Sequence, residues 1–233
     1  ERDITTSLTV TAAGGINENQ FPEILDLFFS RNHIASMMVQ PLAFSGRASS
    51  FTGRSSRLFI PDVVRLLGAS GHRAVEASDF IPLPCSHPLC FSLAFYIADH
   101  SGSFTSVNRL LHLDKYLDVL SNRVFFGLDS EEQELIRDMV YDLWSGPAGS
   151  APTRAEVLKT IRGLLQQLPC GYYNPRDTFS IVERHIKSIF IHAFQDCETF
   201  DLARVRRCCN AYPMPDGSLM PLCVHNVLKR QHQ

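Results

Sequence analysis

Residues 4–39 read ITTSLTVTAAGGINENQFPEILDLFFSRNHIASMMV, and this stretch decides the fold class. Ile4–Thr11 is rich in β-branched residues and predicts a strand. Pro22 suits the first turn of a helix, whose apolar side chains recur at helical spacing as far as Phe29. Ile34–Val39 is nearly all apolar, as a strand buried on both faces should be. A strand, a helix and a second strand in this order imply parallel strands with a right-handed crossover, so we expect an α/β protein.

One β-α-β unit is too small to be a domain. The remaining strands either come from elsewhere in the chain or precede Glu1. Because no further run of alternating strands and helices follows, we expect the chain to be the C-terminal part of a longer protein. Residues 1–47 would be its last β-α-β unit, and residues 48–233 a mostly helical extension.

The extension is expected to serve as scaffold. Apolar residues at helical spacing predict helices near residues 61–67, 107–120, 135–144, 153–168, 177–194 and 201–207. Leu93–Ala98 is compatible with either a short strand or a helix. None of these helices carries residues with an identifiable chemistry.

A cysteine-bearing hairpin is predicted near the C-terminus. Asp216-Gly217 is a strong two-residue hairpin signal, because a type I′ turn needs positive φ at both central residues. Cys208 lies on one side of this turn and Cys223 on the other, so the hairpin would bring their thiols together. Three nearby prolines favour a short, irregular ribbon.

A second pair of cysteines, Cys85 and Cys90, lies in the proline-rich stretch IPLPCSHPLC. Proline fixes φ and discourages helix, so this stretch is predicted to be a stiff loop that points both thiols at one object. With the hairpin thiols they would form a four-thiolate site suited to zinc or an iron–sulfur cluster. The alternative is that all four are ordinary buried cysteines.

The other candidate ligands have weaker cases. Cys209 adjoins Cys208 and is interpreted as structural, although the two could exchange roles. Cys170 and Cys197 have no partner at metal-ligand spacing. The histidines of interest could be ligands, but such side chains more often hydrogen-bond the backbone; they are His87, His192 and His225.

Composition excludes several classes of function. The formal net charge is −2 with mixed signs, which gives no indication of nucleic-acid binding. No apolar run is long enough to span a bilayer, and the first residues do not resemble a signal peptide. Seven cysteines without a secretory signal favour a reducing, cytoplasmic location. The loop that carries Arg47, Arg54 and Arg57 is interpreted as solvated, with anion contact as the alternative.

Several short motifs in order resemble radical S-adenosylmethionine enzymes of the subgroup that contains archaeal tetraether lipid synthase, whose relatives include pterin-dependent methyltransferases. The motifs are Gly15-Ile-Asn17, Gln40-Pro-Leu-Ala-Phe-Ser-Gly-Arg47, Ile60-Pro-Asp-Val63, Pro84-Cys-Ser-His-Pro-Leu-Cys90, Lys187-Ser-Ile-Phe-Ile-His192, Phe200-Asp-Leu202, Cys208-Cys-Asn210, Pro215-Asp-Gly217 and Pro221-Leu-Cys223. The resemblance covers nearly the whole chain.

The resemblance implies the C-terminal part of a partial (β/α)6 barrel, followed by the helical extension with its cysteine hairpin. The complete barrel would hold a 4Fe-4S cluster and S-adenosylmethionine, from which a 5′-deoxyadenosyl radical is generated. Cys85, Cys90, Cys208 and Cys223 match the extension's ligands of an auxiliary 4Fe-4S cluster.

The resemblance also implies which residues contact S-adenosylmethionine. Gly15 and Asn17 match a loop that contacts this cofactor, and Gln40 begins the motif that ends the last barrel strand. The family's C-x3-C-x2-C motif is absent, so this chain cannot generate the radical without an N-terminal half in cis or in trans. Ala193 and Gln195 also depart from the His and Met expected after His192.

Three functions follow as expectations. The first is carbon–carbon bond formation between lipid alkyl chains, with a lipid or other hydrophobic substrate and peripheral membrane contact. The second is radical methylation of a small or pterin-like substrate. The third is a non-enzymatic module in which a four-cysteine zinc site only holds the fold together.

Overall fold

The computed structural model describes residues 4–99, 101–110 and 185–229, together with residues 138, 141, 155, 158, 159, 162 and 163. Those single positions are helical. The predicted helices at 135–144 and 153–168 otherwise lie outside the described residues, as do most of the one at 107–120 and Cys170.

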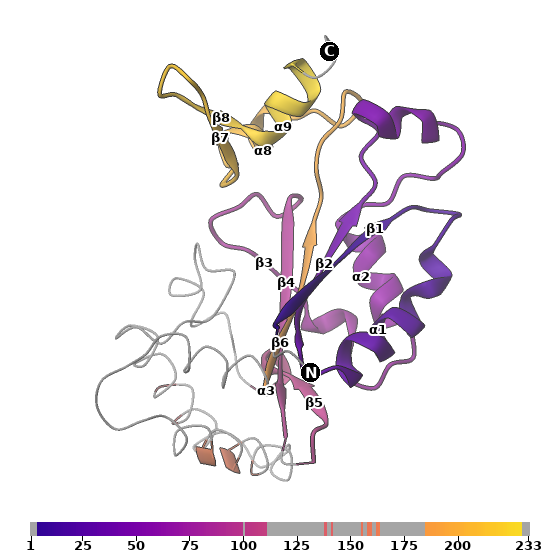
Figure 1. The fold of residues 1–233 in the computed structure, drawn as a ribbon, viewed down its shortest axis with the longest axis vertical. Coiled ribbons are helices and arrows are strands. Elements are labelled where there is room, and N and C mark those ends of the chain that lie inside the picture. The colour runs from indigo at the N-terminus through magenta and orange to yellow at the C-terminus, as the bar shows by residue number, and fades with distance from the viewer. Residues whose placement is uncertain are drawn as a thin grey trace.

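A six-stranded mixed sheet forms the centre of the fold, in the order β1-β2-β6-β4-β3 with β5 paired to β4 (Figure 1). β1, β2 and β6 are mutually parallel, and β4 runs antiparallel to β6. The strands are β1 (Thr6–Ala12), β2 (Ile34–Pro41), β3 (Ile81–Pro82), β4 (Phe91–Ala98), β5 (Phe104–Ser106) and β6 (Ile186–His192). The prediction of an α/β protein is therefore confirmed.

Short helices connect and cover these strands. They are η1 (Glu18–Gln20), α1 (Phe21–Ser30), η2 (Gly46–Phe51), α2 (Ile60–Gly68), η3 (Ala77–Asp79), α3 (Val107–Leu110), α8 (Leu202–Arg206), α9 (Leu222–Val224) and the π-helical turn η6 (His225–Lys229). The predicted unit β1-α1-β2 is present, with Pro22 in the first turn of α1. No helix among the described residues is long and apolar enough to cross a membrane.

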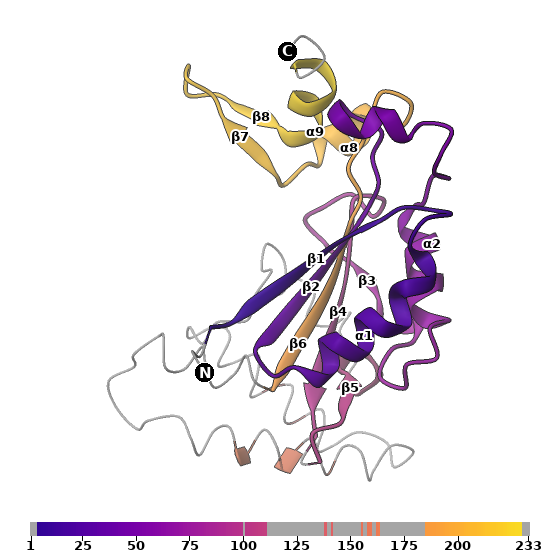
Figure 2. The ribbon, with the colours of Figure 1, turned by 45° about the vertical axis from the view of Figure 1, so that its right-hand side comes forward.

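Helices α1 and α2 cover one face of the sheet (Figures 1 and 2). Their buried side chains, among them Leu25, Phe28 and Leu67, pack against Met37 and Ile189 from β2 and β6. Fully burying one such side chain contributes about 1.5–3 kcal/mol, so this layer supplies much of the stability. A second core on the other face gathers mainly side chains of β4; it includes Leu93, Phe95, Leu110 and Phe190.

The predicted helix at 177–194 is wrong over its second half, where Ile186–His192 forms strand β6. The spacing of Ile186, Ile189 and Phe190 fits a helix as well as a strand, and a short apolar run cannot decide between them. Pairing decides it, because β6 bonds to β2 on one side and to β4 on the other. Residues beyond Arg47 thus complete the sheet that begins with β1 and β2. The division into two domains at Arg47 remains a prediction.

The C-terminal hairpin is confirmed, but its turn differs from the one predicted. Strands β7 (Ala211–Pro213) and β8 (Leu219–Pro221) pair in antiparallel fashion. Gly217 donates its N–H to the carbonyl of Met214 at 3.0 Å, and Met214 donates to Ser218 at 2.9 Å. Pro215 and Asp216 therefore occupy the centre of the turn, and Gly217 follows with φ +81°. This three-residue loop replaces the two-residue type I′ turn because the fixed φ of proline suits the first central position of a type I turn.

Lys187 is a fully buried cation on the central strand β6. Its ammonium group donates to the carbonyls of Arg31 and Ile34, and it lies 4.9 Å from the ring centre of Phe28 and 5.4 Å from that of Phe104. The contacts tie the end of α1 to the start of β2. Burial lowers the pKa of Lys187 to about 8, because removal from water disfavours the charged form.

This pKa predicts a pH dependence of stability. Between pH 8 and 10.5 the unfolded chain binds a proton at Lys187 that the folded chain has lost, so this group makes stability rise with pH. The rise is on the order of 3 kcal/mol across the window. Chemical denaturation gives the free energy of unfolding of the wild type and of Lys187→Met at each pH in this range. The contribution of Lys187 is the difference between the two pH profiles. Parallel profiles would contradict the prediction.

Candidate metal centre and adjoining pocket

The cysteine loop and the hairpin meet beyond the C-terminal ends of β2 and β6 (Figures 1 and 2). In the loop, Ser86 donates to the carbonyl of Leu83, and Cys90 donates to that of His87 at 2.8 Å. The N–H of Ala193 then bonds to the carbonyl of Cys90 at 2.9 Å, which ties the end of the loop to the end of β6. Two segments about 100 residues apart are thereby held together.

Five cysteines gather at this end of the molecule. The sulfur atoms of Cys85 and Cys209 lie 3.9 Å apart. Burial raises the pKa of Cys90, and the nearby thiols of Cys208 and Cys209 raise it further, against a lowering by Arg204. Burial also raises the pKa of Cys223, and Cys208 and Cys90 again add to the effect. The predicted approach of the loop thiols to the hairpin thiols is therefore present.

The structure favours a larger role for Cys209 than the sequence suggested. It is Cys209 whose sulfur contacts that of Cys85, whereas the thiol of Cys208 donates to the carbonyl of Asn210 at 3.0 Å. Among the described residues, however, no three His, Cys, Asp or Glu side chains are arranged so that they could hold a metal ion. Ligation by Cys85, Cys90, Cys208 and Cys223 remains a prediction. Cys197 is exposed.

Arg204, which the sequence did not single out, lies among these thiols. The residue is 6% exposed, and its Nε donates to the sulfur of Cys90 at 3.2 Å. One Nη atom donates to the carbonyl of Ala193 at 2.9 Å. The position is set by α8, whose first turn is capped by Asp201, because the side chain of Asp201 accepts the N–H of Ala203. A guanidinium beside a thiol favours the thiolate form, which is the form that binds metals.

Each of the three histidines has a different environment. His87 uses its ring nitrogen Nδ1 to accept the N–H of Leu89 at 3.2 Å. Burial and the charge of Arg204 lower the pKa of His192 to about 4, so its ring is neutral at pH 7. The His225 ring lies 4.7 Å from that of Tyr212 in a tilted arrangement, and its buried Nδ1 has no hydrogen-bond partner among the described residues. That orphaned atom leaves His225 as the histidine with unused bonding capacity near Cys223.

The residues predicted to contact S-adenosylmethionine follow or end the parallel strands β1 and β2. Asn17 donates its side-chain N–H to the carbonyl of Thr11 at 2.8 Å and accepts the N–H of Ala13 at 2.9 Å. It therefore closes the loop after β1, in which Gly15 has φ +77°. Gln40, near the end of β2, is partly buried and bonds to the sulfur of Met38. Cofactor contact by these residues remains a prediction.

A buried ion pair between Arg57 and Asp196, called the brace below, stabilises this end of the sheet. The fully buried carboxylate of Asp196 accepts the guanidinium of Arg57 at 2.5 Å and the N–H of Phe44 at 2.8 Å. Burial alone would raise the pKa of Asp196, but the hydrogen bonds from Arg57, Phe44 and Thr199 outweigh it and hold the pKa below 3.8. Arg57 is thus an internal partner, and neither the solvated nor the anion-contacting interpretation of this residue describes it.

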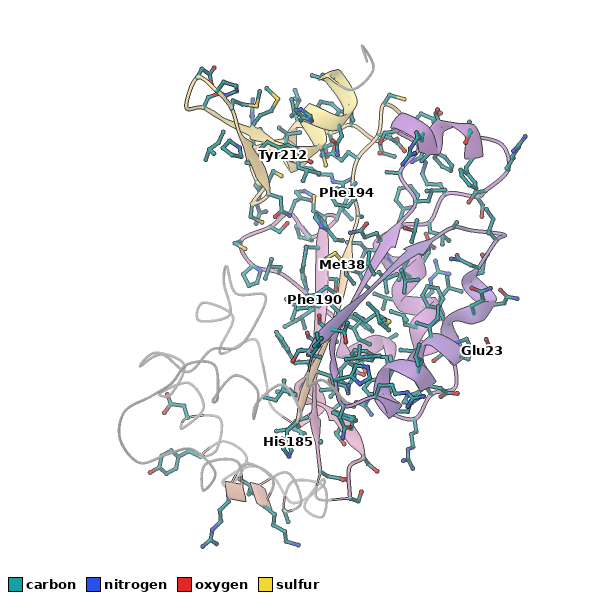
Figure 3. The ribbon with its side chains drawn as sticks, in the orientation of Figure 1. Glu23, Met38, His185, Phe190, Phe194 and Tyr212 are labelled. Atoms are coloured by element: carbon teal, nitrogen blue, oxygen red, sulfur yellow. The ribbon has the colours of Figure 1, made fainter. Side chains whose placement is uncertain are left out.

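A pocket of about 520 Å³ lies beside the brace and the thiols. Apolar side chains form most of its wall, and Arg57 and Arg204 also line it; the apolar members include Leu42, Leu58, Phe59, Leu89 and Phe194. Figure 3 shows Phe194 between the sheet and the hairpin residue Tyr212. Pro41, the last residue of β2, and Ala193, which directly follows β6, also line it. This edge of an open α/β sheet is where such folds bind ligands.

No protein-family model matches the sequence. The chain is similar to a 7,8-dihydro-6-hydroxymethylpterin dimethyltransferase of Methanocaldococcus jannaschii, with 23% identity over 248 residues. The match covers 96% of this chain and 48% of that protein, so the chain spans about half the length of its relative. This distant relationship agrees with the methyltransferase branch of the resemblance seen in the sequence. It gives no support to carbon–carbon bond formation between lipids.

Asp196 and Glu198 both pair with Arg57, and we expect their substitutions to change the free energy of unfolding by different amounts. Asp196→Asn should lower the free energy of unfolding by on the order of 2–3 kcal/mol at pH 7, because it leaves a partly buried guanidinium without its buried partner. Glu198→Gln, at the 67% exposed second partner, should change it by less than about 1 kcal/mol. The Asp196 contribution should be present above pH 3.8 and disappear as the pH falls through the lowered folded-state pKa. Equal effects of the two substitutions in denaturant titrations would contradict this account.

Proposed function

We propose that this chain is the C-terminal portion of a radical S-adenosylmethionine enzyme that methylates a small, ring-containing substrate. The observation that carries the proposal is the gathering of five cysteines beside a pocket at the carboxyl edge of parallel strands. The similarity to a pterin dimethyltransferase supports methyl transfer as the reaction. The pocket volume lies within the range of about 300–1,000 Å³ that small-molecule sites occupy.

The chemistry of the donor set suits a thiolate-bound metal centre, although the described side chains are not arranged around a metal position in this structure. Cys85, Cys90 and Cys223, with either Cys208 or Cys209, would hold it, and thiolates are the ligands of both iron–sulfur clusters and structural zinc. An iron–sulfur cluster supplies one-electron chemistry when bound. Arg204 would donate to the Cys90 sulfur and favour its thiolate form, against the burial that raises the pKa of Cys90.

S-adenosylmethionine is the proposed methyl and radical source. Gly15, Asn17 and Gln40 would contribute to its site at the edge where β1 and β2 end, with Asn17 shaping the loop through its two backbone bonds. Because the C-x3-C-x2-C motif is absent, the residues that generate the radical would belong to an N-terminal half in cis or in trans. The partial (β/α)6 barrel is part of this proposal.

A second candidate function is a zinc-stabilised module without catalysis. It is favoured by the same thiols, which join the loop at Cys85 to the hairpin and could serve only to hold them together. The identity of the metal separates the two functions.

Anaerobic quantitation of iron, sulfide and zinc on this chain is the test. We expect about four irons per chain, lost in the double variant Cys85→Ala, Cys223→Ala and retained in the exposed-site control Cys197→Ala. Single variants Cys208→Ala and Cys209→Ala assign the fourth ligand, since only loss of the true ligand should deplete the metal. Stoichiometric zinc would favour the structural module, and absence of both metals would reject the metal centre.

A further inference from the structure

We propose that the pocket beside the thiols binds a molecule that combines an apolar body with one carboxylate group, and that Arg204 receives the carboxylate. The inference rests on the proposed function for the role of this pocket as a substrate site. It concerns the chemistry of the ligand, which the sequence and the similarity to known proteins leave open.

The walls of the pocket select the body of the ligand. Leu42 and Leu58 line it from the segments that follow β2, and Leu89 and Phe194 line it from the cysteine loop and the end of β6. A ring or a short alkyl chain placed among these side chains would be removed from water, at a gain of roughly 25 cal/mol per Å² of apolar surface. Such a wall rejects a fully polar ligand, because its polar groups would lose their water without finding partners.

The charges that line the pocket are not equivalent. Arg57 is neutralised by Asp196 and Glu198, at 2.5 and 2.8 Å. On the acidic side, Asp62 pairs with Arg65 and accepts the N–H of Phe59, and Asp201 is occupied as the cap of α8. Of these three lining groups, Arg57 and Asp62 are therefore already paired with opposite charges, and Asp201 is held by a backbone N–H.

Arg204 is different. Its described partners are the Cys90 sulfur and the Ala193 carbonyl, which occupy Nε and one Nη atom. Its other Nη atom has no hydrogen-bond partner in the described part of the chain, and no carboxylate there lies within ion-pair distance of it. A guanidinium buried to 6% exposure with free donors on a pocket wall is matched best by a carboxylate oxygen of the ligand.

Two sources of this chemistry can be separated by experiment. Isothermal titration calorimetry of the anaerobically purified chain would use 1-naphthoate, which has a ring, and decanoate, which has an alkyl chain. Each is paired with its neutral counterpart, 1-naphthalenemethanol or 1-decanol. We expect at least one carboxylate to bind at least tenfold more tightly than its alcohol. The carboxylate that binds shows whether the site prefers rings or alkyl chains.

Variants on one helix assign the anion site. Arg204→Gln should weaken carboxylate binding at least tenfold, whereas Arg206→Gln, at an exposed position of the same α8, should leave it unchanged. Leu42→Trp, which fills the pocket without touching the charge, should also abolish binding, so the proposal stays testable if Arg204→Gln does not fold by circular dichroism. Absence of binding to both carboxylates, equal binding of acids and alcohols, or equal effects of the two arginine substitutions would overturn the proposal.

The readout is separate from that of the proposed function. Carboxylate binding with stoichiometric zinc would keep the ligand site and reject the radical enzyme. Bound iron without carboxylate binding would support the radical enzyme and reject the carboxylate site.

Discussion

The structure depends on the position of β6 between β2 and β4. The strand bonds to a parallel neighbour on one side and an antiparallel neighbour on the other, so both its edges are satisfied and both its faces are buried. Its first residues carry Lys187 to the end of α1, and the residues after it supply Ala193 and Asp196 to the pocket and the brace. A slip of one residue would exchange Ile189 and Phe190 between the two cores and displace both ends at once.

The sequence predicts local structure well where local rules suffice. Pro22 lies in the first turn of α1, the helix predicted near residues 201–207 is present as α8, and a hairpin forms around Asp216-Gly217. The strand β6 could not be predicted in the same way, because the spacing of its apolar residues fits both a helix and a strand. The strands that decide between them, β4 and β2, lie about 90 and 150 residues away in sequence. The approach of the loop thiols to the hairpin thiols could be predicted from the hypothesis that they share one metal, and the structure shows the approach without testing the metal.

The burial of Arg204, in contrast, could not be predicted from the sequence. Arg204, Arg206 and Arg207 are alike in sequence, yet one is buried and the other two are exposed. What distinguishes them is the direction in which a short helix presents each side chain, and Arg204 is the one that reaches Cys90 before β4 and Ala193 after β6. Likewise, Arg57 stood among three similar arginines of a loop, and only the fold shows which of them meets the buried Asp196.

The prolines of the hairpin have a consequence for the behaviour of the protein in a crowded solution. β7 ends at Pro213 and β8 ends at Pro221, and each proline lacks the N–H that a further strand would need. The ribbon is exposed and only three residues long on each side, so it offers a poor template for a strand from another molecule. The thiol-bearing arms can thus stay accessible to a metal without the ribbon becoming a seed for edge-to-edge aggregation.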